Sequence, residues 1–176
     1  MTRVRFAGFG GQGVVLSGFI LGRAACLHAG KHAAMTQNYG PESRGGACSA
    51  DVVVEDHEIA VPVFSQPDLL VLLSQEAASM NSGWIADAKL VLIDEDLVHL
   101  EGPGERVQRA PFTRTATGLG RRIVANIVML GTLTRRAGLV PQPAMEEAIA
   151  ATVPRKTVEL NLKAFRAGLE LAGVPA

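Results

Sequence analysis

The chain has little cysteine. Only two cysteines, Cys26 and Cys48, occur in its 176 residues, and they do not form a CxxC pair. Two isolated thiolates cannot supply the four ligands of a structural zinc site or of an iron–sulfur cluster. Because free cysteines are usually buried, both are expected to be reduced core thiols. A metal centre built on this chain's own cysteines is therefore excluded.

The chain also lacks an excess of charge and a long apolar run. Seventeen basic and seventeen acidic side chains cancel, and no cluster of Lys or Arg suggests a surface for nucleic acid. The longest apolar runs fall far short of the roughly 20 residues that span a bilayer. A strand pattern starts within three residues of the N-terminus, without the apolar core of a signal peptide. We expect a cytoplasmic protein that binds neither nucleic acid nor a membrane.

Groups that would point to metal or hydrolytic chemistry are scattered. The histidines lack the spacing of metal ligands, and they are His28, His32, His57 and His99. Acidic residues 94–96 follow a predicted strand, and we expect a solvated turn there rather than a cation site. No serine lies in a G-x-S-x-G motif. The sequence therefore assigns no catalytic residue and no metal ligand to this chain.

Short apolar runs and helical patterns alternate along most of the chain. Strands are predicted at residues 3–7, 31–37, 47–55, 69–73 and 90–93, with a short strand ending at Pro62. Helices are predicted at residues 14–27, 120–137, 143–151 and 154–172. The period of two in residues 47–55 favours a half-covered strand, whereas residues 69–73 and 90–93 are apolar throughout, which is typical of strands in the middle of a sheet. This order predicts an α/β fold: a single three-layer α/β/α, Rossmann-like domain over residues 1–176, with a mixed, mainly parallel sheet and a helical C-terminal third.

A glycine-rich turn, GFGGQG, separates the first predicted strand from the first predicted helix. Gly8, Gly10 and Gly13 fit the pattern G-x-G-x-x-G, in which small residues let a phosphate approach a helix N-terminus. A dinucleotide site also needs an acid at the end of the second strand, and residues 35–37 are Met-Thr-Gln. A self-contained dinucleotide-binding oxidoreductase is therefore the weaker hypothesis. Gln12 favours a turn that grips another backbone or a ligand over one that only connects two elements.

A second unusual segment, YGPESRGG, holds the only tyrosine of the chain, Tyr39. Pro41 fixes one backbone angle, and the glycines permit angles closed to other residues. Glu42 and Arg44 place opposite charges two residues apart. The residues alone fit either a shaped binding loop or a solvated loop with a weak internal ion pair.

Five segments, taken in order, carry a family resemblance. They are GFGGQGVVLSGFIL, YGPESRGGACSADVVV, LLVLLSQEA, NIVMLG and NLKAFRAG. Together they resemble the gamma subunit of 2-oxoacid:ferredoxin oxidoreductases over residues 3–168, within the wider pyruvate/ketoisovalerate oxidoreductase gamma-domain family. The YGPE-x-RGG loop is more similar to the 2-oxoglutarate and branched-chain members than to the pyruvate members. Indolepyruvate oxidoreductases, which share a similar glycine turn, are a near neighbour.

The resemblance implies a multisubunit enzyme. Such an enzyme decarboxylates a 2-oxoacid on thiamine diphosphate, passes electrons through iron–sulfur clusters to ferredoxin and delivers the acyl group to coenzyme A. Thiamine diphosphate, magnesium and the clusters are expected on partner subunits, with none in this chain. The implied partners are alpha and beta subunits, with a delta subunit and a homodimer of the isolated chain left open. This chain would be inactive alone, and a scaffolding module of the same fold is a further alternative.

The resemblance also marks candidate binding residues. They are Gly8, Gly10, Gly11, Gln12 and Gly13 in the turn, and Tyr39, Gly40, Pro41, Glu42, Arg44, Gly45 and Gly46 in the loop. Arg44 is expected to bind an anion or a carboxylate, and Glu42 to orient Arg44 or to contact another subunit. Whether these residues touch coenzyme A, thiamine diphosphate or only other subunits stays open.

Overall fold

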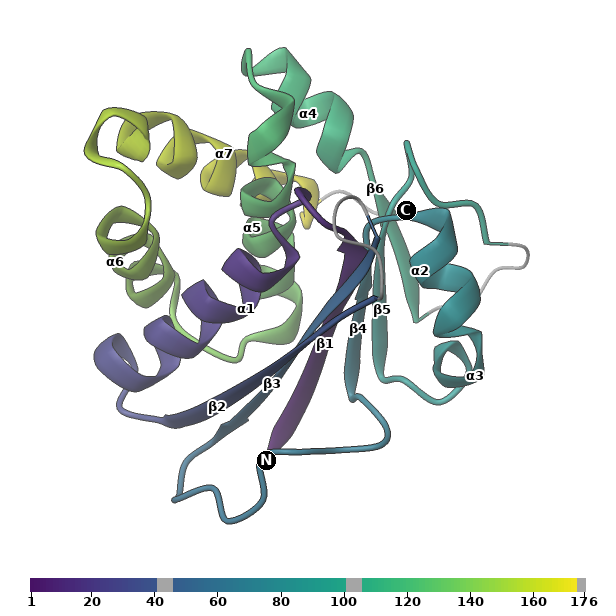
Figure 1. Ribbon diagram of the computed structural model, residues 1–176. Helices are drawn as coiled ribbons and strands as arrows, with labels where there is room; N and C mark the ends of the chain where they lie inside the picture. Colours follow the sequence, from purple (N-terminus) through teal and green to yellow (C-terminus); the bar gives the residue numbers. More distant parts are fainter. Residues whose placement is uncertain (41–45, 101–105, 174–176) are drawn as a thin grey trace.

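The computed structural model describes residues 1–40, 46–100 and 106–173 of the chain. Within these ranges six strands form one sheet in the order β2-β3-β1-β4-β5-β6 (Figure 1). The strands are β1 (Thr2–Phe9), β2 (His32–Tyr39), β3 (Ala47–Glu55), β4 (Leu69–Leu72), β5 (Leu90–Asp94) and β6 (Val107–Ala110). Strands β1, β4, β5 and β6 are parallel, and β3 runs antiparallel to both β1 and β2. The predicted mixed, mainly parallel sheet is confirmed.

Helices cover both faces of the sheet (Figure 1). One face carries α1 (Val14–Arg23) with its π-helical extension η1 (Ala24–His28), α4 (Phe112–Gly118), η2 (Arg122–Val124), α5 (Ala125–Ala137), α6 (Gln142–Thr152), η3 (Arg155–Thr157) and α7 (Val158–Leu171). The other face carries the short helices α2 (Gln75–Met80) and α3 (Ser82–Ile85). The three layers and the helical C-terminal third follow the prediction.

Two apolar clusters hold the layers together, because successive side chains of a strand point to opposite faces. Phe6 of β1 packs with Ile20 and Met129 on the face of α1 and α5. Ala7 packs with Leu70 on the face of α2. Each fully buried Leu, Ile or Phe contributes roughly 1.5–3 kcal/mol relative to an exposed one.

Helices α5 and α7 cross backbone to backbone. A Cβ atom on Gly131 would lie 2.0 Å from the carbonyl oxygen of Phe165, and one on Gly168 would lie 1.9 Å from that of Val128. The hydroxyl of Thr132 donates to the carbonyl oxygen of Gly168 at 2.8 Å. Gly131 ends the segment NIVMLG, and Gly168 ends the segment NLKAFRAG. The close crossing of α5 and α7 therefore explains why each segment ends in glycine.

Several local predictions were wrong. No strand ends at Pro62, because residues 56–68 form neither helix nor strand and Pro62 has no N–H for a ladder. Cys26 is exposed, since η1 turns its side chain outward, whereas Cys48 is buried as predicted. Strand β3 was predicted to be covered on one face only, but it is covered on both faces near Asp51, which is 5% exposed.

Asp51 is buried because it forms an ion pair with Arg5, and the ring of Trp84 lies over the Arg5 guanidinium. Arg5 Nε donates to Asp51 Oδ1 at 2.6 Å, and the guanidinium lies 4.3 Å from the Trp84 ring centroid. An alternation pattern cannot reveal that an acidic residue is buried by such a pair. None of the described helices is both long and apolar enough to cross a membrane.

Candidate functional site

Four parallel strands end at one edge of the sheet. Strands β1, β4, β5 and β6 run in the same direction, and α1 begins just beyond the end of β1 (Figure 1). In α/β proteins, ligands bind in the crevice outside the carboxyl ends of such strands. The glycine turn lies at this edge, which makes the edge the first place to look for a site.

The glycines of the turn are needed for different reasons. Gly13 has a φ of 75°, and an added Cβ would lie 2.4 Å from the side-chain nitrogen of Asn126. At Gly8, an added Cβ would lie 2.5 Å from Gln12 Oε1. Gly11 has a φ of 95° and open space where a side chain would be. Gly11 therefore leaves its part of the edge open.

The amide of Gln12 is bonded to the ends of two strands. Its Oε1 accepts the backbone N–H of Phe9 at 2.6 Å, and its Nε2 donates to the carbonyl oxygen of Leu73 at 2.7 Å. The Gln12 side chain thus connects the ends of β1 and β4 through hydrogen bonds at this edge of the sheet. Gln12 fixes the shape of the site through two backbone groups.

The tyrosine loop, residues 39–46, is hydrogen-bonded to the glycine turn at its described C-terminal end. The N–H of Gly10 donates to the carbonyl oxygen of Gly46 at 3.0 Å, and the N–H of Gly40 donates to that of Ala47 at 2.7 Å. Tyr39 is 64% exposed, and its hydroxyl donates to Gln37 Oε1 at 3.4 Å. The structure thus brings both described ends of the loop to the edge. The predicted site residues Pro41, Glu42, Arg44 and Gly45 lie outside the described residues.

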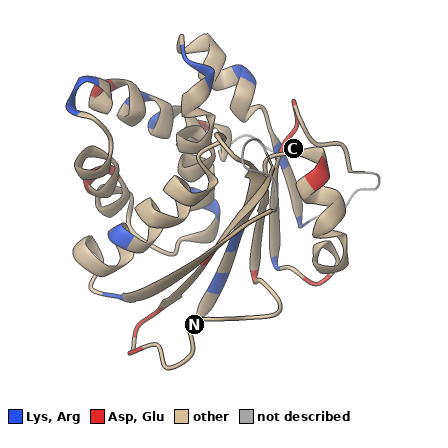
Figure 2. Cartoon of the chain, viewed as in Figure 1, with Lys and Arg blue, Asp and Glu red and all other residues tan. Residues whose placement is uncertain are grey.

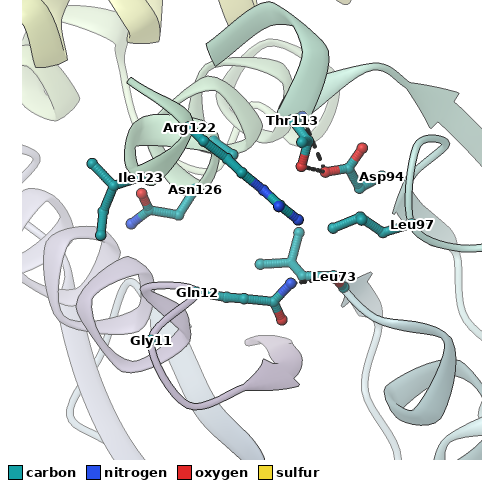
Figure 3. A pocket seen from close by; sticks show the side chains of 10 residues that line it. Gly11, Gln12, Leu73, Asp94, Leu97, Thr113, Arg122, Ile123 and Asn126 are labelled. Carbon is teal, nitrogen blue, oxygen red and sulfur yellow. Dashed lines mark hydrogen bonds between the residues drawn. The ribbon is translucent and has the colours of Figure 1, made fainter. Parts of the chain in front are cut away.

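A cavity of about 250 Å³ opens beside the turn (Figure 3). It is lined by Gly11, Gln12, Leu73, Asp94, Leu97, Thr113, Arg122, Ile123, Ala125 and Asn126. The Arg122 side chain extends into the cavity from the turn before α5 (Figure 3). The Arg122 side chain is exposed, and it makes no hydrogen bond or ion pair with the described part of the chain. Its positive charge is therefore available to a ligand.

Asp94 forms the opposite wall of the cavity and is only 1% exposed. It accepts hydrogen bonds from the hydroxyl of Thr113 at 2.6 Å and from the Thr113 N–H at 3.1 Å. Burial raises the pKa of its carboxyl group. The expectation of a solvated acidic turn is wrong for Asp94, because the start of α4 folds over the end of β5. Its neighbours Glu95 and Asp96 are only partly exposed, and both pair with Arg114, Asp96 at 3.2 Å.

Asn126 connects α5 to the start of α1. It is 3% exposed, and its Nδ2 donates to the carbonyl oxygen of Gly13 at 3.3 Å. No side chain of a described residue caps the N-terminus of α1. Free N–H groups of a first helical turn favour an anion, and Arg122 adds a positive charge to the cavity beside the turn that leads into α1. The cavity therefore suits an anionic group such as a carboxylate or a phosphate.

The same region lacks the arrangement of a dinucleotide site. In such folds the second strand lies parallel beside β1 and carries an acid for the ribose. Here antiparallel β3 lies beside β1, and its Ala47 pairs with Phe9. Among the described residues, no three His, Cys, Asp or Glu side chains gather to hold a metal ion.

Sequence reasoning did not single out Arg122 and Thr113, two polar residues of the cavity. Both lie more than 90 residues beyond the glycine turn, and only the fold brings them to it. The available signal was weak: an Arg pair directly before a buried helix, and a threonine in the first turn of a short helix.

Several known proteins are similar to this chain. Residues 3–171 match the family of pyruvate ferredoxin/flavodoxin oxidoreductases. The chain is 48% identical to a 2-oxoglutarate synthase subunit, KorC, of Methanocaldococcus jannaschii, over 96% of this chain and 92% of that protein. It is 36% identical to the ketoisovalerate oxidoreductase subunit VorA of Methanothermobacter thermautotrophicus, over 97% of this chain but 36% of that protein.

A solved structure shares the fold along its whole length. This is the gamma subunit of a keto/oxoacid ferredoxin oxidoreductase from Geobacter sulfurreducens, with a TM-score of 0.84, 41% sequence identity and 98% of both chains covered. The family predicted from the motifs is thereby confirmed. The chain belongs to the pyruvate ferredoxin/flavodoxin oxidoreductase family.

Proposed function

We propose that this chain is the gamma subunit of a 2-oxoglutarate:ferredoxin oxidoreductase. The observation that carries the proposal is the 48% identity with a 2-oxoglutarate synthase subunit over nearly the full length of both chains. The assembled enzyme oxidatively decarboxylates 2-oxoglutarate to its acyl-CoA and reduces ferredoxin. The chain acts as one domain over residues 1–176, in the cytoplasm.

The redox chemistry belongs to partner subunits in this proposal. Thiamine diphosphate with magnesium, and the iron–sulfur clusters, are held by partner subunits. The partners are alpha and beta subunits, with a delta subunit left open, and coenzyme A is the co-substrate. Cys26 lies in η1 and Cys48 in β3, so the two thiols of this chain come from different elements. A cluster needs four such ligands. The chain is accordingly inactive alone.

This chain contributes the edge formed by the glycine turn, the tyrosine loop and the adjoining cavity. The proposed contact residues are Gly8, Gly10, Gly11, Gln12, Gly13, Tyr39, Gly40, Pro41, Glu42, Arg44, Gly45 and Gly46. Support comes from the hydrogen bond that joins Gly10 to Gly46, which holds the two segments side by side. Arg122 and the start of α1 would hold an anionic group of a substrate or of coenzyme A.

Co-expression with the candidate partner chains tests the proposal. With an affinity tag on the thiamine-binding subunit, we expect this chain to be recovered in a fixed ratio to the tagged subunit. Replacing Arg44 or Glu42 with Ala should then lower turnover in the assembled complex without loss of this chain. If the wild-type chain is absent from the purified complex, the proposal fails.

A branched-chain 2-oxoacid is the second candidate substrate. The observation that favours it is the 36% identity with a ketoisovalerate oxidoreductase subunit. The ratio of kcat/KM for 2-oxoglutarate to kcat/KM for 2-oxoisovalerate, measured on the purified complex, distinguishes the two. A ratio above one supports 2-oxoglutarate, and a ratio below one supports the branched-chain acid.

A further inference from the structure

The outer strand of the sheet has an open edge. β2 pairs with β3 on one side, and no strand of a described residue pairs with its other side. An edge strand presents unpaired N–H and C=O groups, and proteins usually protect such an edge with lysine, proline or a bulge. The sequence of β2, HAAMTQNY, contains neither lysine nor proline, and its pairing with β3 is continuous from His32 to Tyr39.

An apolar groove runs along this edge, between β2 and α1. Its volume is about 280 Å³. Small residues and Met35 form it on the inner side, and the outer wall contains Phe19 and Leu27, which are 50% and 64% exposed. The lining residues are Gly18, Phe19, Gly22, Arg23, Cys26, Leu27, Ala33, Ala34 and Met35.

The exposed side of α1 and η1 is apolar except at one position. Phe19, Arg23, Cys26 and Leu27 recur at helical spacing, so their side chains share one face. Figure 2 shows almost no charge on α1 and β2, in contrast to the loops and the outer helices. Large exposed apolar side chains gathered in one place are typical of a surface that another protein covers.

Arg23 is the charged member of the groove, and its side chain has no partner among the described residues. Its Nε is buried and has no hydrogen-bond acceptor within the described part of the chain. A carboxylate on a docking partner would pair with the positive charge of the guanidinium group. A second copy of this chain that paired through its own β2 and groove would not supply the carboxylate, because neither of them contains an acidic residue. Pairing β2 with its own copy would bring a second Arg23 to the same surface instead.

We propose that an extended segment of another subunit of the oxidoreductase adds a strand to β2, with apolar side chains in the groove and a carboxylate on Arg23. This mode of recognition combines backbone hydrogen bonds along an open edge with side-chain pockets beside it. The proposal rests on the proposed function, since it takes its partner from the same complex. It assigns the α1–β2 surface to subunit assembly and leaves the carboxyl edge of the sheet to ligands.

Two substitutions with matched controls test the groove. Gly22→Leu should fill it, whereas a Cβ atom at Gly22 lies 3.9 Å from Ala33 Cβ, so Gly22→Ala should fold and leave the groove open. Arg23→Glu should repel the partner's carboxylate, and Arg155→Glu makes the same change at an exposed position of η3. In the co-expression assay we expect Gly22→Leu and Arg23→Glu to lower recovery of this chain about tenfold, which corresponds to about 1.4 kcal/mol. The two controls should be recovered like the wild type.

Hydrogen exchange on the wild type provides a readout that needs no variant. Alternate amides of β2 that point away from β3 should exchange more slowly in the complex than in the isolated chain. Equal exchange in both states, full recovery of both groove variants, or an isolated chain that is already a dimer protected at β2 would each overturn the inference. Wild-type chain that joins the complex with an unprotected β2 refutes this inference alone, whereas wild-type chain that never joins it refutes the proposed function as well.

Discussion

The bonding of Gln12 leads to a quantitative prediction. Gln12→Ala removes the acceptor of the Phe9 N–H and the donor to the Leu73 carbonyl at one time. Both backbone groups are partly buried, so each loss costs about 1 kcal/mol, and the free energy of unfolding should fall by about 2 kcal/mol. For a chain of this size, that corresponds to a melting temperature lower by roughly 4–8 °C.

Gln12→Glu separates hydrogen bonding from shape. The carboxylate can still accept the Phe9 N–H, but its second oxygen would face the Leu73 carbonyl oxygen, where Gln12 donates at 2.7 Å. The folded state therefore favours the protonated acid and raises its pKa above the unfolded value. The stability deficit of this variant should shrink as the pH falls through the raised folded pKa, and be smallest below the unfolded pKa.

Urea unfolding of the isolated chain measures both effects, with Gln37→Ala as the control. Gln37 is an exposed glutamine on β2, and its replacement should change stability by less than about 0.5 kcal/mol. If Gln12→Ala is as stable as the control, the Gln12 amide does not hold the strand ends. A Gln12→Glu deficit that does not change with pH would refute the electrostatic part of the argument.

Three further predictions concern glycines and one ion pair. Gly13→Ala should lower the free energy of unfolding by about 2 kcal/mol or more, because Gly13 has a positive φ and an added Cβ would overlap Asn126. In a double-mutant cycle, adding Asn126→Ala should restore part of this loss. Gly168→Ala should lower the free energy of unfolding, measured by thermal unfolding, by about 3 kcal/mol or more, because its Cβ would lie 1.9 Å from a carbonyl oxygen of α5. The control, Gly83→Ala, has open space around the added Cβ and should change stability by about 1 kcal/mol at most. Arg3 binds the Asp68 carboxylate at 2.8 Å and lowers the pKa of Asp68 well below its unfolded value of 3.8. The wild type should therefore be more stable than Asp68→Asn, with the full advantage present above pH 3.8. This advantage should be lost as the pH falls through the folded pKa. Unfolding curves from about pH 6 to about pH 2 check the sign, and an advantage that grows with acid would contradict it.

The sheet and its main helices could be predicted because their patterns are local. Residues 69–73 and 90–93 are apolar throughout, and they became β4 and β5 in the middle of the sheet. The predicted limits of β3, 47–55, agree with the structure. The four elements that were not predicted are β6 and the helices α2, α3 and α4, each of four to seven residues. Segments of that length contain too few positions for a hydrophobic period to stand out.

The site was predictable only in part, because its residues meet through tertiary structure. The glycine turn is recognisable from spacing, since strand, turn and helix follow one another in sequence. Asp94 resembled a solvated residue because its partner, Thr113, comes 19 positions later in the chain. Arg122 enters the cavity only because α5 packs beside α1. Burial of a carboxylate or approach of a distant arginine leaves no periodic signal in a sequence.

The central claim is that this chain is a subunit of a 2-oxoglutarate:ferredoxin oxidoreductase, and an omission experiment tests it most directly. The partner subunits are supplied with thiamine diphosphate, magnesium, coenzyme A and 2-oxoglutarate, and ferredoxin reduction is followed with and without the purified chain. We expect reduction to be lost without the chain and to return when it is added. Ferredoxin reduction at the full rate without the chain would contradict the claim.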